Sequence, residues 1–306
     1  MKNRNPRILF FGTPEFAAQS LRDIVDQGFE VVGVVTAPDK PSGRGMKLQS
    51  SAVKSVAVSL GLPVFQPTNL KSDDFFHDIK LLHADLGVVI AFRMLPEKIW
   101  GAPKLGSINL HGSLLPKYRG AAPIQHAIIQ GESKTGLTVF FLRHEIDTGD
   151  ILATVEVPIL DSDDFGTLHD RMMHSGSELV TKSIALIEKQ NYTLIAQSNL
   201  GNASFAPKIS REFCEIKSGD TTVIAHNKIR GLSPYPGAWV DSPWGTVKIF
   251  KTLLTNLPAS GAERIQIIGK SVYLLCADGL LEIAVLQLPG KPKISGLDFV
   301  NGQKSK

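Results

Sequence analysis

Short apolar runs alternate with amphipathic stretches over the first 190 residues. Runs with few polar residues are typical of strands buried on both faces of a parallel sheet. They occur at 7–11, 30–36, 64–66, 86–91, 107–111, 136–142 and 151–157. Helices are predicted between them, at about 14–26, 51–60, 122–130 and 165–189. This alternation predicts an α/β fold, a Rossmann-like, mainly parallel sheet.

Turn-forming residues mark two of the connections between the predicted strands and helices. Gly12 ends the first strand, and Thr13-Pro14 predicts a helix whose N-cap is Thr13 and whose first residue is Pro14. Residues 37–50 are expected to form a loop, because Pro and Gly interrupt them. The turn at 10–16, around Gly12, has one glycine where a pyrophosphate cradle needs three, which disfavours a dinucleotide site.

The pattern changes after about residue 190. Residues 199–207 are small, polar and rich in turn formers, as a linker is. Strand-like runs follow at 222–225, 246–251, 271–276 and 280–288. They predict a smaller C-terminal β-barrel, OB-like in kind. We therefore expect a catalytic domain at 1–190, a linker at 191–208 and a barrel domain at 209–306.

Charge is concentrated in the last third of the chain. Residues 209–306 hold 12 Lys and Arg against 8 Asp and Glu, an excess that equals the whole chain's net charge of +4. A basic tail domain favours a polyanionic partner. No apolar run approaches the ~20 residues of a membrane span, and the run at 8–11 is too short for a signal peptide, so we expect a cytoplasmic protein. Cys214 and Cys276 match no metal or redox spacing and are expected to be buried free thiols.

Candidate chemistry gathers at the end of the 107–111 strand. Asn109 and His111 lie two residues apart, so both side chains point to one face of the sheet. An amide can donate to a developing oxyanion and an imidazole can move a proton. Asp147 and Asp150 follow the 136–142 strand, and either could orient the imidazole. Because loops at the carboxyl ends of strands share one crevice, we expect these groups to meet.

At these residues the chain resembles a known family. The motif Asn-x-His-x-Ser-Leu-Leu-Pro at 109–116, followed by Asp-Thr-Gly-Asp at 147–150, is similar to the folate-dependent formyltransferases. The resemblance implies a catalytic triad of Asn109, His111 and Asp147. It also implies 10-formyltetrahydrofolate as co-substrate and no metal. The folate would lie between two walls formed by Ser113, Leu114, Leu115 and Pro116 and by Arg93, Met94 and Leu95.

Four further motifs narrow the resemblance, the first of them the Gly-Thr-Pro-Glu-Phe turn at 12–16. This turn and residues 40–45 (Lys-Pro-Ser-Gly-Arg-Gly), 116–125 and 229–239 are similar to members that act on an aminoacylated tRNA. They imply that the acceptor is the α-amino group of methionyl initiator tRNA, formylated for translation initiation. Lys40, Arg44 and Lys47 would then contact the tRNA, and the basic tail domain would add affinity. We expect a monomer, because a tail occupied by RNA needs no partner subunit.

Two alternatives remain open at this point. The chain could formylate the amine of a ribonucleotide or a nucleotide sugar, although the basic tail speaks against the former and the 40–45 motif against the latter. It could also be a non-catalytic tRNA-binding protein, which would have no chemical need for the three triad residues.

Overall fold

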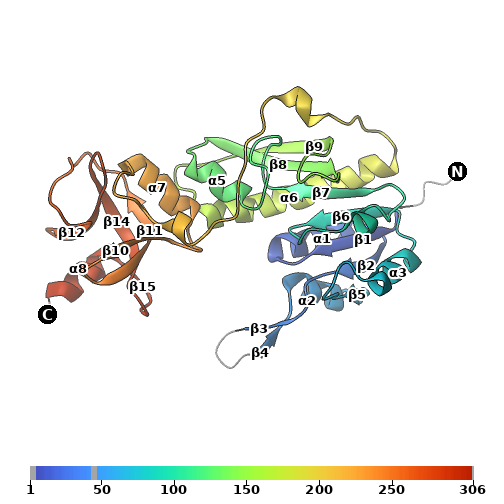
Figure 1. Cartoon of the computed structure of the whole chain (residues 1–306), viewed down its shortest axis with the longest axis horizontal. Helices are drawn as coiled ribbons and strands as arrows, with labels where there is room; N and C mark the ends of the chain where they lie inside the picture. Colours follow the sequence, from blue (N-terminus) through green and yellow to red (C-terminus); the bar gives the residue numbers. More distant parts are fainter. Residues whose placement is uncertain (1–4, 43–46, 305–306) are drawn as a thin grey trace. The chain divides into compact units, whose positions relative to one another are not determined.

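The computed structural model describes residues 5–42 and 47–304, which fold into two compact units (Figure 1). The first unit comprises residues up to 120, 136–157 and 170–205. The second comprises 121–135, 158–169 and 206–306. The chain therefore passes from one unit to the other more than once.

A seven-stranded sheet forms the centre of the first unit. Its order is β5-β2-β1-β6-β7-β8-β9. The first five of these are parallel, and β8 is antiparallel to β7. The strands are β1 (Ile8–Gly12), β2 (Val31–Val35), β5 (Val64–Phe65), β6 (Leu86–Ile90), β7 (Ser107–His111), β8 (Lys134–Phe141) and β9 (Ile151–Pro158). The predicted mainly parallel α/β sheet is confirmed.

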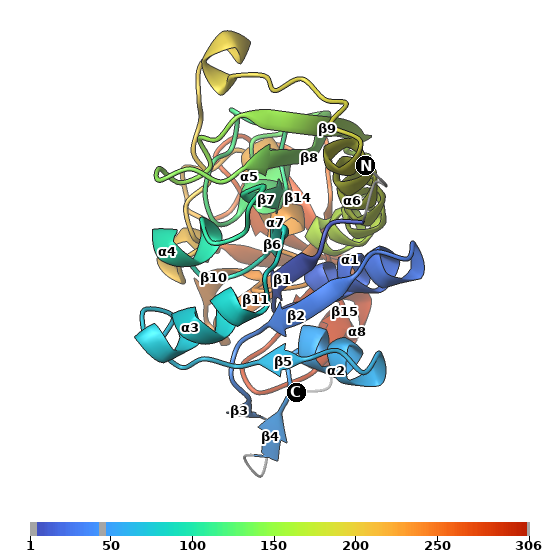
Figure 2. The ribbon, with the colours of Figure 1, turned by 90° about the vertical axis from the view of Figure 1, so that its right-hand side faces the viewer.

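Helices cover both faces of this sheet. They are α1 (Glu15–Asp26), α2 (Ala52–Ser59), α3 (Asp73–Leu81), α4 (Glu97–Trp100) and α6 (Phe165–Glu188). Figure 2 shows α1 and α6 on one side of the strands and α3 and α4 on the other. A Cβ on Gly176 of α6 would lie 2.9 Å from Leu110, so Leu110 faces α6. Asn109 and His111, one residue away on either side, face the opposite way.

Two local predictions in this unit were wrong. Helix α1 starts at Glu15 with Pro14 as its N-cap, and no side chain caps it. The extended conformation of Pro14 (ψ 176°) sets the helix start one residue later than predicted. Part of the expected 37–50 loop is a two-stranded antiparallel sheet, β3 (Lys40–Ser42) with β4 (Lys47–Gln49), since backbone pairing satisfies groups that an open loop leaves to water.

The second unit is built on an antiparallel half-barrel sheet. The order is β10-β11-β14-β13-β12, with β15 paired to β14. Its strands are β10 (Ala238–Ser242), β11 (Gly245–Leu253), β12 (Ile265–Ile268), β13 (Ser271–Leu275), β14 (Leu280–Gln287) and β15 (Lys293–Ser295). The helices α5 (Pro123–Ile129), α7 (Thr222–Gly231) and α8 (Gly296–Lys304) also belong to this unit. Helix α5 packs so closely on α7 that a Cβ on Gly231 would lie 2.6 Å from Ile129.

The predicted strand at 222–225 is wrong, because these residues open α7. Thr, Val and Ile favour strands locally, but tertiary contacts decide here. The Thr221 hydroxyl accepts from the Ile224 amide and caps the helix, and Asp278 accepts from the Thr222 amide. Ala225 and Ile229, one helical turn apart, are both fully buried in the unit's apolar core.

Both cysteines lie in the second unit as buried free thiols, as predicted. Burial raises the pKa of the Cys214 thiol and raises that of Cys276 to about 11. Neither is therefore a thiolate at neutral pH. Among the described residues, no helix is both long enough and apolar enough to span a bilayer.

Candidate active site

His111 sits at the last position of β7, almost fully buried, with a polar partner at each ring nitrogen. Its Nε2 lies 2.8 Å from the Tyr118 carbonyl oxygen, and its Nδ1 lies 3.8 Å from Asp147 Oδ2. A carbonyl only accepts, so Nε2 carries a hydrogen. Nδ1 is then the nitrogen free to take up a proton, and it faces a carboxylate. The ring is held in one tautomer with its basic nitrogen inside the site.

Asp147 is held from its backbone as well as its side chain. Its Oδ2 accepts from the Gly120 amide at 2.8 Å. Its φ of +55° lies in the left-handed region, which is uncommon for residues other than glycine. Two residues on, a Cβ on Gly149 would lie 1.6 Å from the Phe141 carbonyl oxygen, so only glycine fits there. The loop therefore holds the carboxylate in one place by a constrained backbone.

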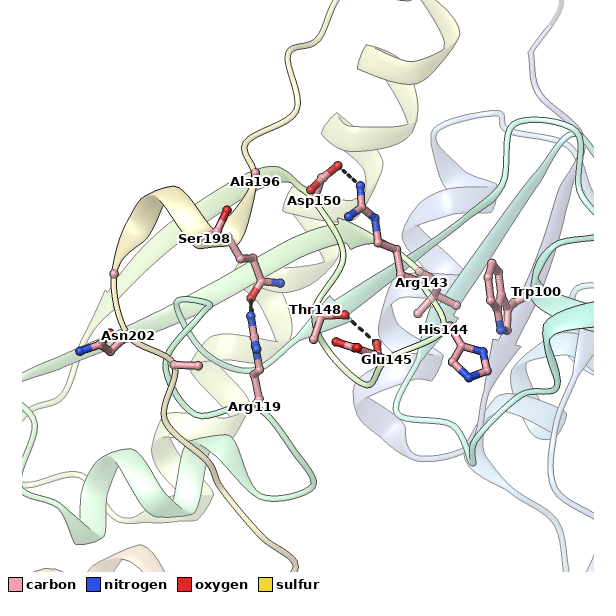
Figure 3. Close-up of a pocket in the computed structure, with 14 residues that line it drawn as sticks. Trp100, Arg119, Arg143, His144, Glu145, Thr148, Asp150, Ala196, Ser198 and Asn202 are labelled. Atoms are coloured by element: carbon pink, nitrogen blue, oxygen red, sulfur yellow. Dashed lines mark hydrogen bonds and ion pairs between the residues drawn. The ribbon is translucent and has the colours of Figure 1, made fainter.

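Asp150 was the other candidate partner for His111, and the structure separates the two. Arg143 Nη2 lies 2.5 Å from Asp150 Oδ2, so that carboxylate is engaged in an ion pair (Figure 3). Asp147 is the aspartate whose carboxylate lies beside the imidazole.

The Asp147 loop and the end of β7 meet, as predicted, but not because both follow parallel strands. β8 runs antiparallel to β7, with Phe141 opposite Ile108. The end of β8 therefore lies at the amino end of β7, away from His111. Asp147 reaches His111 because the β8–β9 connection, residues 142–150, turns back along the sheet. The rule for parallel strands does not apply to this pair.

The residues expected to contact folate lie in two loops at one edge of the sheet. Residues 93–95 follow β6 and residues 113–116 follow β7, and these strands are parallel neighbours. Met94 is exposed, and the Arg93 guanidinium donates to the carbonyls of Pro67 and Thr68. Leu95 packs against the apolar cluster that includes Ile79 and Ile99.

The second of these loops is well fixed. Ser113 Oγ donates to the Lys117 carbonyl at 2.6 Å, and the Thr138 hydroxyl donates to the Ser113 carbonyl and accepts from the Leu115 amide. Leu115 is buried against Phe140 and Ile151. Leu114 packs on Gly136 of β8. Both leucines therefore pack within the protein.

A cavity of about 900 Å³ lies beside the Asp147 loop in the first unit (Figure 3). Trp100, Arg119, Leu142, Thr148 and Gln197 are among its lining residues. No pattern in the sequence had indicated a role for Tyr118, Arg119, Gly120 or Gln197. The Tyr-Arg-Gly stretch was visible as a motif, but only the fold shows that its backbone contacts both His111 and Asp147.

The residues expected to contact tRNA are only partly described. Lys40 is exposed on β3, Lys47 lies in β4, and Arg44 lies outside the described residues. The base of this hairpin is anchored by Asp39, which contacts Lys54 Nζ at 2.5 Å and Gln66 Nε2 at 2.8 Å. The hydrogen bond from Lys54 lowers the pKa of Asp39. Within residues 5–42 and 47–304, no group of three or more His, Cys, Asp or Glu side chains is placed to hold a metal ion.

The site thus combines an amide and an imidazole on one strand with a carboxylate beside the imidazole. All three residues lie within a region that matches a known protein family. The formyl transferase model matches residues 6–184, and the model for the formyl transferase C-terminal domain matches residues 208–304. The chain belongs to the formyl transferase family.

Curated relatives point to one branch of that family. The chain is 44% identical to the methionyl-tRNA formyltransferase of Parabacteroides distasonis, over 99% of this chain and 98% of that one. Two solved structures share the fold at low identity. One is HypX from Aquifex aeolicus in complex with tetrahydrofolic acid (TM-score 0.68, 18% identity, 99% of this chain and 48% of that one). The other is WlaRD, a sugar 3N-formyl transferase (TM-score 0.68, 22% identity, 94% of this chain and 100% of that one).

Proposed function

We propose that this chain transfers the formyl group of 10-formyltetrahydrofolate to the α-amino group of methionyl initiator tRNA. The observation that carries the proposal is the 44% identity to a methionyl-tRNA formyltransferase over nearly the whole of both chains. The placement of His111 beside Asp147, with Asn109 on the same face of β7, supports the chemistry.

The reaction makes one C–N bond and breaks another. The neutral amine attacks the formyl carbon, and the carbonyl oxygen becomes an oxyanion. The bond from that carbon to the folate nitrogen then breaks, and the proton lost by the amine ends on the folate nitrogen. Free α-amino groups titrate near ~8, so a neutral amine is readily available.

Asn109 and His111 are proposed to stabilise the oxyanion, a role in which one lost donor costs about 3–4 kcal/mol in other enzymes. The Nδ1 of His111 is the atom at which a proton would be taken up, because Nε2 already donates to the Tyr118 carbonyl. Asp147 Oδ2, 3.8 Å away, would stabilise the imidazolium and help to pass the amine proton to the folate nitrogen.

Substrate contacts are proposed from the loops around this centre. Residues 93–95 and 113–116 would flank the folate, and the side chain of Met94 among them is exposed. Lys40, Arg44 and Lys47 would contact the tRNA, and the basic tail domain at 209–306 would add salt-sensitive affinity for its phosphates.

A transfer assay with labelled formyl donor tests the proposal. The acceptors are methionyl initiator tRNA, methionyl elongator tRNA, glycinamide ribonucleotide and a dTDP-linked amino sugar, offered in parallel. We expect label in methionyl initiator tRNA and at most background in the other three. Preferential labelling of the amino sugar or the ribonucleotide would overturn the proposal, and binding of tRNA without transfer to any acceptor would favour the non-catalytic alternative.

A further inference from the structure

Gln197 is a buried polar residue in a stretch that was expected to be a linker. It begins the short 3₁₀ helix η1 (Gln197–Leu200), and only 3% of its surface is exposed. It lies between the two family-model matches, since the first ends at residue 184 and the second begins at residue 208. A buried amide in a connecting segment needs partners for its polar atoms, because burying it unpaired is costly.

The Gln197 side chain uses both ends of its amide. Its Oε1 accepts from Arg119 Nε at 3.1 Å and Nη2 at 2.6 Å. Its Nε2 donates to the Asp147 carbonyl at 2.9 Å and the Gly149 carbonyl at 2.8 Å. A guanidinium only donates and a carbonyl only accepts, so the amide can have only this orientation. All of its hydrogen-bonding capacity is used.

These partners are the two loops that touch the catalytic groups. Arg119 lies between Tyr118, whose carbonyl contacts His111, and Gly120, whose amide binds the Asp147 carboxylate. Asp147 has a left-handed backbone conformation, and Gly149 has no room for a Cβ. Gln197 thus holds the carbonyls at both ends of the strained 147–149 segment and ties them to the 118–120 loop.

The neighbouring backbone reinforces the same junction. Ile195 exchanges backbone hydrogen bonds with Ile151, just after the Asp147 loop. Ser204 accepts from the Tyr118 amide at its hydroxyl and from the Arg119 amide at its carbonyl. Residues 195–204 therefore bridge the two loops at several points, and Gln197 is the buried side chain in that bridge.

We infer that Gln197 is a positioning residue for the formyl transfer, acting through Asp147. This inference rests on the proposed function. Without the two Nε2 donors, the backbone at Asp147 can relax away from its left-handed conformation, and the carboxylate moves from His111. Both ends of the Gln197 amide are engaged by protein groups, so we expect its loss to lower kcat while leaving KM for the formyl donor and for the tRNA nearly unchanged.

The key variant is Gln197→Glu. It preserves size and the contact with Arg119, but an ionised carboxylate cannot donate to the Asp147 and Gly149 carbonyls. We expect kcat to fall tenfold or more and both KM values to stay within about twofold. The matched control is Asn199→Ala, an exposed position on the same 3₁₀ helix, which should behave as the unaltered chain.

A double-mutant cycle with Asp147→Asn separates positioning from general structural damage. If Gln197 acts through Asp147, the Gln197→Glu change costs little further once Asp147 is already altered. Independent, fully multiplying losses in the double variant would overturn the inference. So would a loss in Gln197→Glu that only follows the folded fraction seen in thermal unfolding.

If Gln197→Glu does not fold, Arg119→Lys serves as the second variant. It keeps a positive charge but cannot present two donors to Gln197 Oε1 in the same fork. We expect a smaller fall in kcat, again dependent on Asp147, and an unchanged kcat would overturn the inference. An unaltered chain that fails to formylate methionyl initiator tRNA contradicts the proposed function instead, so the two failures are distinguishable.

Discussion

The site around β7 in the first unit and the hydrophobic core of the second unit are built from different kinds of side chain. Around β7 the first unit buries His111, Ser113, Thr138 and Gln197, each with hydrogen-bond partners from neighbouring loops. The hydrophobic core cluster of the second unit consists of 18 buried residues, apolar side chains and two cysteines, and the buried polar residues of that unit, such as Asp163 and Thr252, lie outside the cluster. Buried polar groups add little net stability even when paired, whereas apolar burial is the main source of it. The first arrangement serves chemistry and the second serves stability, so substitutions in each should change different measurements.

The largest effect should come from the polar site. We expect His111→Ala to lower formyl transfer by about 10²–10⁴-fold, because it removes the proton-handling group. Affinity for tRNA, measured by filter binding or fluorescence, should stay within a few-fold. Arg44→Ala is expected to do mainly the reverse. Full formylation by the His111 variant would contradict the proposed mechanism.

A substitution at Gly149, two residues from Asp147, should lower both the stability and kcat. In Gly149→Ala the new Cβ would lie 1.6 Å from the Phe141 carbonyl oxygen, so the loop must move. We expect a stability loss of about 3 kcal/mol and a fall in kcat beyond the loss of folded protein. Urea unfolding and steady-state assays measure the two effects. Gly219→Ala, where a Cβ meets open space, is the control and should change neither.

Much of this site could be read from the sequence, and the exceptions have physical reasons. The apolar run of β7 and its two-residue period placed Asn109 and His111 correctly on one face. The position of Asp147 follows from a hairpin connection and a left-handed residue, which periodicity does not encode. The partners of Gln197 lie 48 to 78 residues away along the chain, beyond any local signal. The 222–225 run was misread because core packing overrode its strand preference.

Truncation in the apolar core should affect stability and leave the chemistry intact. Ile249 of β11 is fully buried in the second unit. We expect Ile249→Ala to cost about 2–5 kcal/mol in urea unfolding, from lost burial and the cavity left behind. At a temperature where the variant is folded, kcat should match that of the unaltered chain. Lys251→Ala, exposed on the same strand, should change neither the stability nor kcat. A large loss of kcat in Ile249→Ala would contradict the distinction between the site and the apolar core.

The smallest effect should be a pH dependence of stability in the second unit. Burial, and secondarily the nearby Arg230 charge, lower the pKa of His226, whose Nδ1 lies 2.9 Å from the Thr252 hydroxyl. The unfolded chain binds a proton below about pH 6.5. The folded chain takes it up only at lower pH, so stability is lost as pH falls from about 6.5 through the folded pKa.

The urea midpoint at pH 7.5 and 5.5 measures this dependence. In His226→Gln the difference between the two midpoints should shrink, since one proton uptake on unfolding has been removed. A difference as large as in the unaltered chain would assign the dependence to other groups. His126, whose pKa is also lowered by burial, is the next candidate.

The placement of α5 in the second unit has a consequence for how the polypeptide is made. Its apolar residues Ile124, Ala127 and Ile128 are buried in the finished protein, and its neighbour α7 begins only at Thr222. The ribosome releases α5 well before α7. The growing polypeptide therefore carries an apolar helix without its partner until the last third of the chain leaves the ribosome. A truncated product ending near residue 200 would keep that helix exposed and be prone to aggregation. A nick between 191 and 208 would not divide the protein into two intact halves either, because residues 121–135 and 158–169 would remain on the wrong fragment.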